Sequence, residues 1–237
     1  MKFITKLKNN LARAVMTLLL AVLTTTAWAI QKDPDDGYYL ISSAQDWQDF
    51  ATGISDGTIA TNANARLTAD NITVSTMIGT SSNKYAGTFD GNNFVIISAI
   101  NTTGSYVAPY SYVNGATIQN LTISGSVNGG IHCSGLIGCS NGTNTVSNVT
   151  INASITTSDS HCGGFIGHGF SSNVTFTNCV FAGEIHGRSA NSLVGVFNGW
   201  SGYNVSLNNC LEKGTYTNCN PFYPLGYGIG NVTNTYY

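Results

Sequence analysis

Charged side chains are scarce in this chain of 237 residues. Asp, Glu, Lys and Arg make up 8% of the sequence, against roughly a quarter in typical soluble proteins, and the formal net charge is −2. Because nucleic-acid binding needs clustered Lys and Arg, we expect no nucleic-acid partner. A calcium site needs clustered Asp or Glu, and none is evident, so we expect no cofactor. The six cysteines form no CxxC pair, so a zinc ribbon is not indicated.

Long apolar runs are missing as well. The run over residues 14–23 is too short to cross a bilayer of ~30 Å as a helix, which needs ~20 residues. It follows a basic segment and precedes Ala27-Trp28-Ala29, with small residues where a signal peptidase cuts. This pattern predicts a cleaved signal peptide over residues 1–29 and a mature chain without a membrane span. We expect a secreted or cell-surface protein, with the periplasm as the other destination of an exported chain.

What the sequence does contain is a repeat. A short glycine-containing motif recurs at residues 134–138 (SGLIG), 163–167 (GGFIG) and 191–195 (NSLVG), with final glycines 29 and then 28 residues apart. A second element, rich in Val, Ile, Thr and Asn, follows each motif, and an earlier copy makes four. These copies lie at residues 117–127, 145–155, 175–185 and 206–216.

Aligning the four copies gives an apolar column and an asparagine column. Their members are Ile118, Val146, Phe176 and Leu207, and Asn120, Asn148, Asn178 and Asn209. Apolar positions separated by polar ones and punctuated by Gly and Asn indicate short strands. A repeat this short buries its apolar side only by stacking on its neighbours. The sequence therefore predicts an all-β fold, a parallel β-helix or solenoid, in which the asparagines form a ladder of amide hydrogen bonds at a bend.

The start of the mature chain predicts a different element. Ser43 followed by Asp46 is typical of the beginning of a helix, and Trp47, Phe50 and Ile54 recur at helical spacing. A solenoid exposes its core and its strand edges at each end. We expect this short helix to cap the first turn.

The remaining boundaries follow from where the repeat begins and ends. Residues 30–84 hold the cap helix and the first strands, and residues 85–217 hold the repeats. Residues 218–237 break the pattern with two prolines and four tyrosines. We expect this last segment to cover the other end of the coil.

Residues 85–92 (YAGTFDGN), the SGLIG and GGFIG motifs and the strands with an Asn before an apolar residue together resemble GLUG-motif repeat proteins. These are exported bacterial β-helix proteins, common among Bacteroidetes, and the resemblance covers residues 38–216. It implies a right-handed parallel β-helix, a surface or secreted location and an adhesin-like role. It implies no single enzymatic reaction.

Two positions depart from the family pattern. Tyr110-Ser111 stands where the first motif is expected to have an apolar residue and a glycine. Glu212 occupies an otherwise apolar column that holds Phe181 in the preceding copy. We therefore expect the last turn to fray or to slip in register.

Three side chains are the best candidates for catalysis. Glu184, His186 and Arg188 alternate along one predicted strand, which places them on one face. Glycoside hydrolysis generally needs two carboxylates, and the few acids after Asp90 fall in different columns. A β-helix polysaccharide lyase or glycoside hydrolase is therefore one alternative for this patch. A solvated strand end with locally paired charges is the other.

Two stacked pairs of His and Cys are predicted, because His132-Cys133 and His161-Cys162 precede the same motif. Metal binding by the two histidines would need further ligands, and packed or surface histidines are the alternative. Stacked cysteines have Cβ atoms ~4.8 Å apart, against ~3.5–4.5 Å in a disulfide, so the state of Cys133 and Cys162 stays open. Another pair replaces Val and Leu in a core column, which favours buried free thiols. These are Cys179 and Cys210.

Aromatic side chains near the C-terminal end suit binding. Trp200 and Tyr203 lie in the longest segment between motifs and can stack on sugar rings, whereas Tyr223 and Tyr227 are expected to plug the end of the coil. These features favour an exported, non-catalytic module for adhesion, with glycans or host or bacterial surface proteins as partners. Besides catalysis, the alternative is a structural part of a cell-surface polymer, because exposed strand edges can pair.

Overall fold

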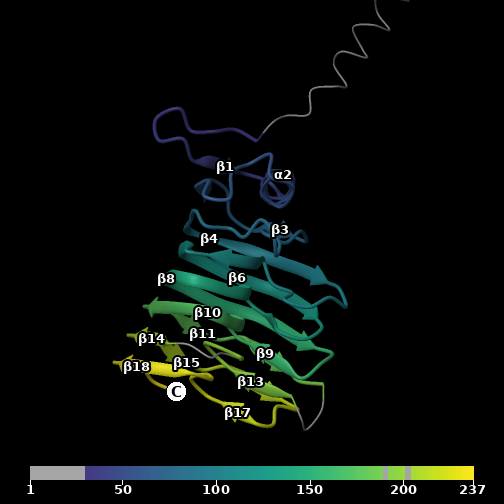
Figure 1. Ribbon diagram of the computed structural model, residues 1–237, viewed down its shortest axis with the longest axis vertical. Coiled ribbons are helices and arrows are strands. Elements are labelled where there is room, and N and C mark those ends of the chain that lie inside the picture. Colours follow the sequence, from purple (N-terminus) through teal and green to yellow (C-terminus); the bar gives the residue numbers. More distant parts are fainter. Residues whose placement is uncertain (1–29, 189–191, 201–203) are drawn as a thin grey trace, which may run out of the picture. The chain divides into compact units, whose positions relative to one another are not determined.

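The structure, a computed structural model, describes residues 30–188, 192–200 and 204–237. Parallel strands coil around one core and form a β-solenoid of about 7 turns (Figure 1). The predicted parallel β-helix is therefore confirmed. The expected signal peptide over residues 1–29 lies outside the described residues.

The strands form two sheets. The path of the larger sheet consists of β1 (Tyr39–Ile41), β2 (Ala65–Leu67), β4 (Thr88–Asn101), β6 (Thr117–Gly129), β8 (Ile137–Thr157), β10 (Ile166–Thr177), β14 (Val205–Asn208) and β18 (Ile229–Thr233). Beside this path lie β3 (Ile72–Val74), β5 (Tyr110–Asn114), β11 (Val180–Phe181), β12 (Glu184–His186), β15 (Leu211–Glu212) and β16 (Thr215–Thr217). The smaller sheet consists of β7 (Cys133–Ser134), β9 (His161–Gly163), β13 (Leu193–Gly195) and β17 (Phe222–Tyr223).

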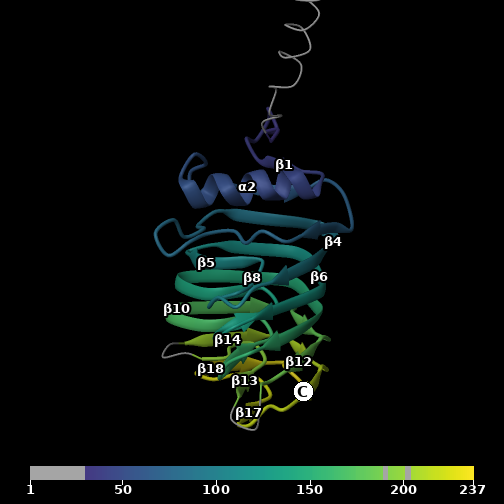
Figure 2. The ribbon, with the colours of Figure 1, turned by 90° about the vertical axis from the view of Figure 1, so that its right-hand side faces the viewer.

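The described residues contain one helix, α2 (Ala44–Asp56), which lies across the first turn of the coil (Figure 2). It begins at Ser43, whose side chain accepts a hydrogen bond from the Asp46 amide. It ends at Gly57, whose φ of 83° lies in the left-handed region. The predicted cap helix is confirmed, and its buried face carries the predicted residues. These are Trp47, Phe50 and Ile54.

Apolar side chains stack in columns inside the coil. Ile118 pairs with Val146, Val146 with Phe176, and Phe176 with Leu207, as the repeat alignment predicts. Phe89 of β4 extends the same column by one turn. All five side chains are buried, and full burial of such a side chain contributes roughly 1.5–3 kcal/mol. Each turn is therefore stabilised by the turns on both sides of it.

The predicted asparagine ladder is present at one bend. Nδ2 of Asn148 donates to Oδ1 of Asn120 at 2.9 Å, Asn178 to Asn148 at 3.0 Å, and Asn209 to Asn178 at 2.7 Å. Above them, Asn120 Nδ2 donates to Asp90 Oδ1 at 3.1 Å. The four asparagines have φ between 53° and 55°, in the left-handed region that Asn adopts more readily than most residues. The column therefore turns the chain and links one turn to the next.

The structure corrects the position of the third glycine motif. Gly195 pairs with Gly163, and the Gly199 amide donates to the Ile166 carbonyl at 2.8 Å, so that Gly199 lies beside Gly167. The third copy is therefore GVFNG, which begins four residues after the NSLVG that the sequence spacing selects. The longer insertion before it explains why a constant spacing misplaces it.

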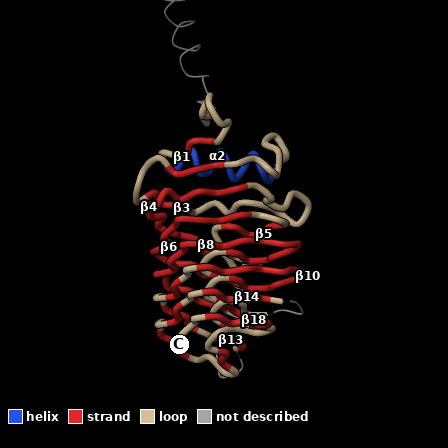
Figure 3. The backbone as a smooth tube through the Cα atoms, turned by 90° about the vertical axis from the view of Figure 1, so that its left-hand side faces the viewer, coloured by secondary structure: helices blue, strands red, loops and turns tan. Residues whose placement is uncertain are grey.

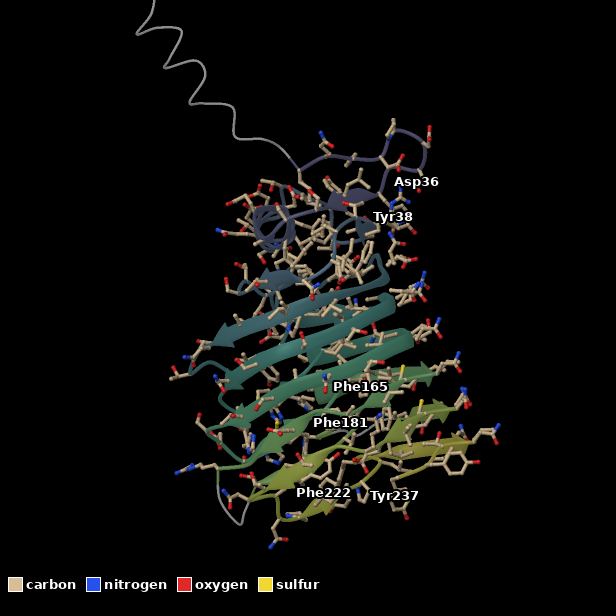
Figure 4. All side chains as sticks on the ribbon, turned by 180° about the vertical axis from the view of Figure 1, so that it is seen from behind. Asp36, Tyr38, Phe165, Phe181, Phe222 and Tyr237 are labelled. Atoms are coloured by element: carbon tan, nitrogen blue, oxygen red, sulfur yellow. The ribbon has the colours of Figure 1, made fainter. Side chains whose placement is uncertain are left out.

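The last copy of the repeat keeps its register although Glu212 stands in an apolar column. Glu212 pairs with Phe181, which lies inside the coil (Figure 4). Its carboxylate accepts hydrogen bonds from the Gly214 amide at 2.7 Å and from the Tyr216 hydroxyl at 2.5 Å. These partners satisfy a carboxylate that would otherwise be costly to bury. The expected fraying or slip does not occur at this position.

Residues 218–237, the expected C-terminal cap, contribute two further strands. β17 pairs in parallel with β13 (Figure 1), and β18 pairs in parallel with β14 (Figure 3), so these strands continue the coil. The described part of the chain has no helix with the length and apolar character needed to traverse a bilayer.

Candidate binding surface

Aromatic and imidazole rings contact one another in sequence along the coil. We call this set the ring stripe. Its members are Tyr106, Tyr112, His132, His161, His168, Phe170, Trp200 and Tyr227. Eight pairs of these rings are in contact, with centroids 4.5–6.0 Å apart, within the range of favourable ring contacts. The stripe therefore joins several turns through side chains on the outside of the core.

Two positions of the repeat supply most of these rings. His132 directly precedes β7 and His161 begins β9, and these strands pair in parallel, so the expected stacking of the two histidines is confirmed. At the second position, Tyr112, Cys139 and His168 stack on β5, β8 and β10. Rings at the first position also contact rings at the second position. For example, the ring centroids of His132 and His168 lie 4.5 Å apart.

Glycines allow the two positions to approach each other. A Cβ atom added to Gly138 would lie 2.1 Å from the carbonyl oxygen of Tyr106, and one added to Gly167 would lie 2.0 Å from that of His132. Neither position has room for a side chain. The last glycine of the motif is therefore the residue that lets the ring-bearing backbone segments come into contact.

Trp200, predicted as a ligand-binding residue, belongs to the stripe and is 37% exposed. Its indole stacks on Tyr227 with centroids 5.0 Å apart and planes 17° apart, and it meets His161 edge-on at 4.7 Å. The indole is thus held by two rings while part of it stays accessible. Tyr227, expected in a terminal plug, lies on the stripe instead. Tyr203, the other predicted ligand-binding residue, lies outside the described residues.

The histidines of the stripe are held in their neutral form. Burial, together with neighbouring His168 and His161, lowers the pKa of His132 to about 4. Burial also lowers the pKa of His161 and of His168. The Nδ1 atoms of His132 and His168 are buried and have no hydrogen-bond partner among the described residues. At neutral pH the stripe is therefore an uncharged surface.

The candidate metal ligands His132 and His161 are neighbours, with ring centroids 5.1 Å apart. Within the described residues, no three or more His, Cys, Asp or Glu side chains form a group suited to hold a metal ion. The structure therefore gives these two histidines a place among stacked rings.

The candidate catalytic residues come together only in part. Glu184 Oε2 lies 3.2 Å from His186 Nε2, and His186 Nδ1 lies 2.7 Å from Thr217 Oγ1, all at the surface. Among the described residues, the side chain of Arg188 forms no hydrogen bond or ion pair with Glu184 or His186, and its backbone amide donates to Ser192 Oγ at 2.9 Å. The patch is thus an exposed pair rather than the predicted group of three.

All six cysteines are free thiols in the structure, and five of them are buried. Cys133 and Cys162 lie with their sulfur atoms 3.3 Å apart, as expected for stacked residues. Burial raises the pKa of Cys162 well above its ordinary value, which keeps this thiol protonated. The free, buried state predicted for Cys179 and Cys210 is confirmed.

Sequence reasoning did not single out Tyr106 or Tyr112. Tyr106 lies 26 residues before His132, whereas His132 and His161 are 29 apart, so a constant period does not align them. The position of Tyr112 could have been predicted from the sequence, because Tyr112 follows the first motif at the same offset as Cys139 follows the second.

The chain matches no family model, no curated protein and no solved structure. The likeness to GLUG-motif proteins therefore rests on the sequence motifs and stays a prediction.

Proposed function

We propose that the protein is an exported, non-catalytic module that binds glycans through the ring stripe. The observation that carries this proposal is the setting of Trp200, which is partly exposed and held between Tyr227 and His161. A fixed indole face is a stacking platform for the apolar face of a sugar ring. Because the indole is already oriented, binding loses little side-chain freedom. The uncharged stripe suits a neutral ligand better than an acidic or basic one.

The repetition of rings along the stripe supports the proposal that the ligand is a glycan chain of several sugar units. The stripe extends through ring contacts from Tyr106 to Tyr227, and two of its rings, Phe170 at 57% and Trp200 at 37% exposure, are open to more than one sugar unit. Simultaneous contacts raise the apparent affinity above that of any single one. The predicted signal peptide and the GLUG-like motifs support deployment at the cell surface or in secreted form, where such binding serves adhesion.

The test is retention of the purified protein on an array of host and plant glycans, repeated with Trp200→Ala. We expect selective retention by the unaltered protein and a loss of about tenfold or more in affinity for the variant, because a stacking face is removed. Leu211→Ala is the matched control, since Leu211 is 36% exposed and lies outside the stripe. Equal retention of both variants, with both folded, would show that the stripe is not the binding site.

A further inference from the structure

A groove with a volume of about 580 Å³ lies at the capped end of the coil. Its walls come from the end of α2, from the segment after β3, from the end of β4 with the loop that follows, and from β5. These segments are distant in sequence, and only β4 and β5 pair in register with strands of the repeat. The groove therefore arises where the cap meets the first turns.

The lining of the groove is rich in hydroxyl groups and has no charged side chain. Five serines, three threonines and Tyr112 are among its thirteen residues. The apolar contribution comes from Met77, from Ile100 and from the ring of Tyr112. Ligand pockets generally measure about 300–1,000 Å³ and combine apolar walls with a few placed polar groups. This groove has a suitable size but an unusually large share of neutral hydroxyls.

Several of these hydroxyls are not used by the fold. Ser111 Oγ donates to the Tyr106 carbonyl at 2.8 Å, and Thr80 Oγ1 accepts from the Asn83 amide at 3.0 Å. By contrast, a group of four serine hydroxyls in the lining has no hydrogen-bond partner among the described residues. These are Ser55, Ser75, Ser81 and Ser105. Their donors and acceptors are available to a ligand.

The walls of the groove are held by the fold. The Ser111 amide donates to the Ile78 carbonyl at 2.8 Å, which joins the segment after β3 to β5. The indole Nε1 of Trp47 donates to the Thr76 carbonyl at 2.7 Å, which joins the same segment to α2. Ile100 is buried beneath the groove. A groove with such walls is formed before a ligand arrives, which favours binding.

We propose that this groove binds a neutral sugar ring, either as a free monosaccharide or as the end of a glycan. Free serine hydroxyls match the alternating donors and acceptors of sugar hydroxyls, and Met77 and Tyr112 supply an apolar face. A charged ligand would lose its hydration without gaining an ion pair. Tyr112 also contacts Tyr106 with centroids 5.2 Å apart, so the groove lies next to the first ring of the stripe. Tyr112 belongs both to the stripe and to the groove lining, whereas Trp200, which carries the proposed function, is not part of the lining.

The experiment is ligand-observed NMR with glucose, galactose, mannose, fucose and N-acetylglucosamine, and with glucuronic acid and glucosamine as charged probes. We expect at least one neutral sugar to bind with a dissociation constant on the order of 1 mM, and the charged probes to bind at least about tenfold more weakly. The methyl glycoside of the bound sugar separates a free reducing sugar from a chain end, since only the latter tolerates the added group.

Two variants locate the bound sugar. Ser105→Trp places a bulky ring in the groove, and Thr145→Trp places the same ring at an exposed position of β8 as a control. We expect Ser105→Trp to weaken binding at least about tenfold and Thr145→Trp to leave it unchanged. Ser75→Trp replaces Ser105→Trp if circular dichroism shows that the latter is unfolded.

Three results would overturn the proposal. They are the absence of binding by every neutral sugar at about 20 mM, equal binding of the charged probes, and binding that survives in a folded groove variant. Trp200→Ala separates this proposal from the proposed function. Sugar binding lost in Trp200→Ala but kept in the groove variants places the ligand on the stripe alone, which rejects the groove and supports the stripe.

Discussion

The asparagine ladder and the ring stripe are both columns of stacked side chains, produced by one repeating coil. In the ladder, each side-chain amide bonds to the next, and the column ends on a carboxylate that accepts the last bond. In the stripe, the rings touch one another, yet two buried ring nitrogens have no partner among the described residues and Trp200 stays partly exposed.

This difference separates a column that completes the fold from one that is open to a ligand. A polar group that is satisfied within the fold contributes to stability and gains little from a partner. A fixed ring with an accessible face adds less to stability and has more to gain on binding. Substitutions in the ladder should therefore lower the free energy of unfolding without changing binding, and substitutions at the exposed end of the stripe should do the reverse.

Gly167→Ala should have the largest effect, because it forces apart the backbone segments behind the stripe. The added Cβ would lie 2.0 Å from the His132 carbonyl oxygen, a backbone atom that cannot move aside. We expect a loss of more than about 3 kcal/mol in the free energy of unfolding, measured by denaturant titration. Gly104→Ala is the control, since its nearest atom would be Thr102 Oγ1 at 3.7 Å, and it should change stability by less than about 0.5 kcal/mol. Similar effects of the two changes would contradict the role given to the motif glycine.

Asn148→Ala should have the next largest effect. It removes two ladder hydrogen bonds and places alanine at a φ of 53°, so we expect a loss of about 2–3 kcal/mol in denaturant titration. Asn148→Gly removes the same bonds but tolerates this φ, and it should lose only about 1 kcal/mol. If glycine were as damaging as alanine, backbone conformation would not be part of the role of this residue. A change in glycan retention for either folded variant would contradict the separation of the two columns.

Mild acid should affect the stripe before the ladder. Burial holds the pKa of His132 at about 4, below its ordinary value of 6.5, so the unfolded chain binds protons more readily than the folded one. The contribution of neutral His132 to the free energy of unfolding is therefore fully present above about pH 6.5, and roughly 1–3 kcal/mol of it is lost as the pH drops toward 4. His161 and His168 act in the same direction. His132→Asn, which suits the φ of 63° at this position, should flatten the pH dependence of denaturant midpoints between pH 6.5 and 4.5. Asn148→Gly should keep the original slope, and an equal slope in His132→Asn would exclude His132 as its source.

The ladder and the stripe also differ in how far the sequence predicts them. The ladder follows from one residue type at one offset within each repeat, and stacking alone brings such residues together. The cap helix was equally predictable from the sequence, since its signals, Ser43 at the start and the helical spacing of Trp47 and Phe50, lie within one short segment. Both rest on short-range patterns that insertions elsewhere do not disturb.

The stripe and the groove depend on contacts between residues that are not separated by a constant number of residues, so the repeat length does not predict them. The stripe joins two positions of the repeat, and the number of residues between these positions differs from copy to copy. The same variation in length places the third glycine motif four residues after the position that a constant spacing selects. The sequence identifies Trp200 as an exposed aromatic residue, but its contacts with His161 and Tyr227 need the folded coil. The groove combines Ser55, Ser105 and other hydroxyls from unrelated segments, which no motif links.

All amides of the asparagine ladder point the same way. An ionised carboxylate only accepts hydrogen bonds, so Asp90 requires the Nδ2 of Asn120 to face it, and this orientation fixes that of every amide below. The amide dipoles add head to tail, with their positive end at Asp90. Burial alone would raise the pKa of Asp90, yet bonds from the Asn92 amide and from the side chains of Gln119 and Asn120 lower it. One carboxylate thus sets the direction of the dipole along the asparagine ladder. A further repeat with an asparagine at this position would lengthen that dipole without reversing it.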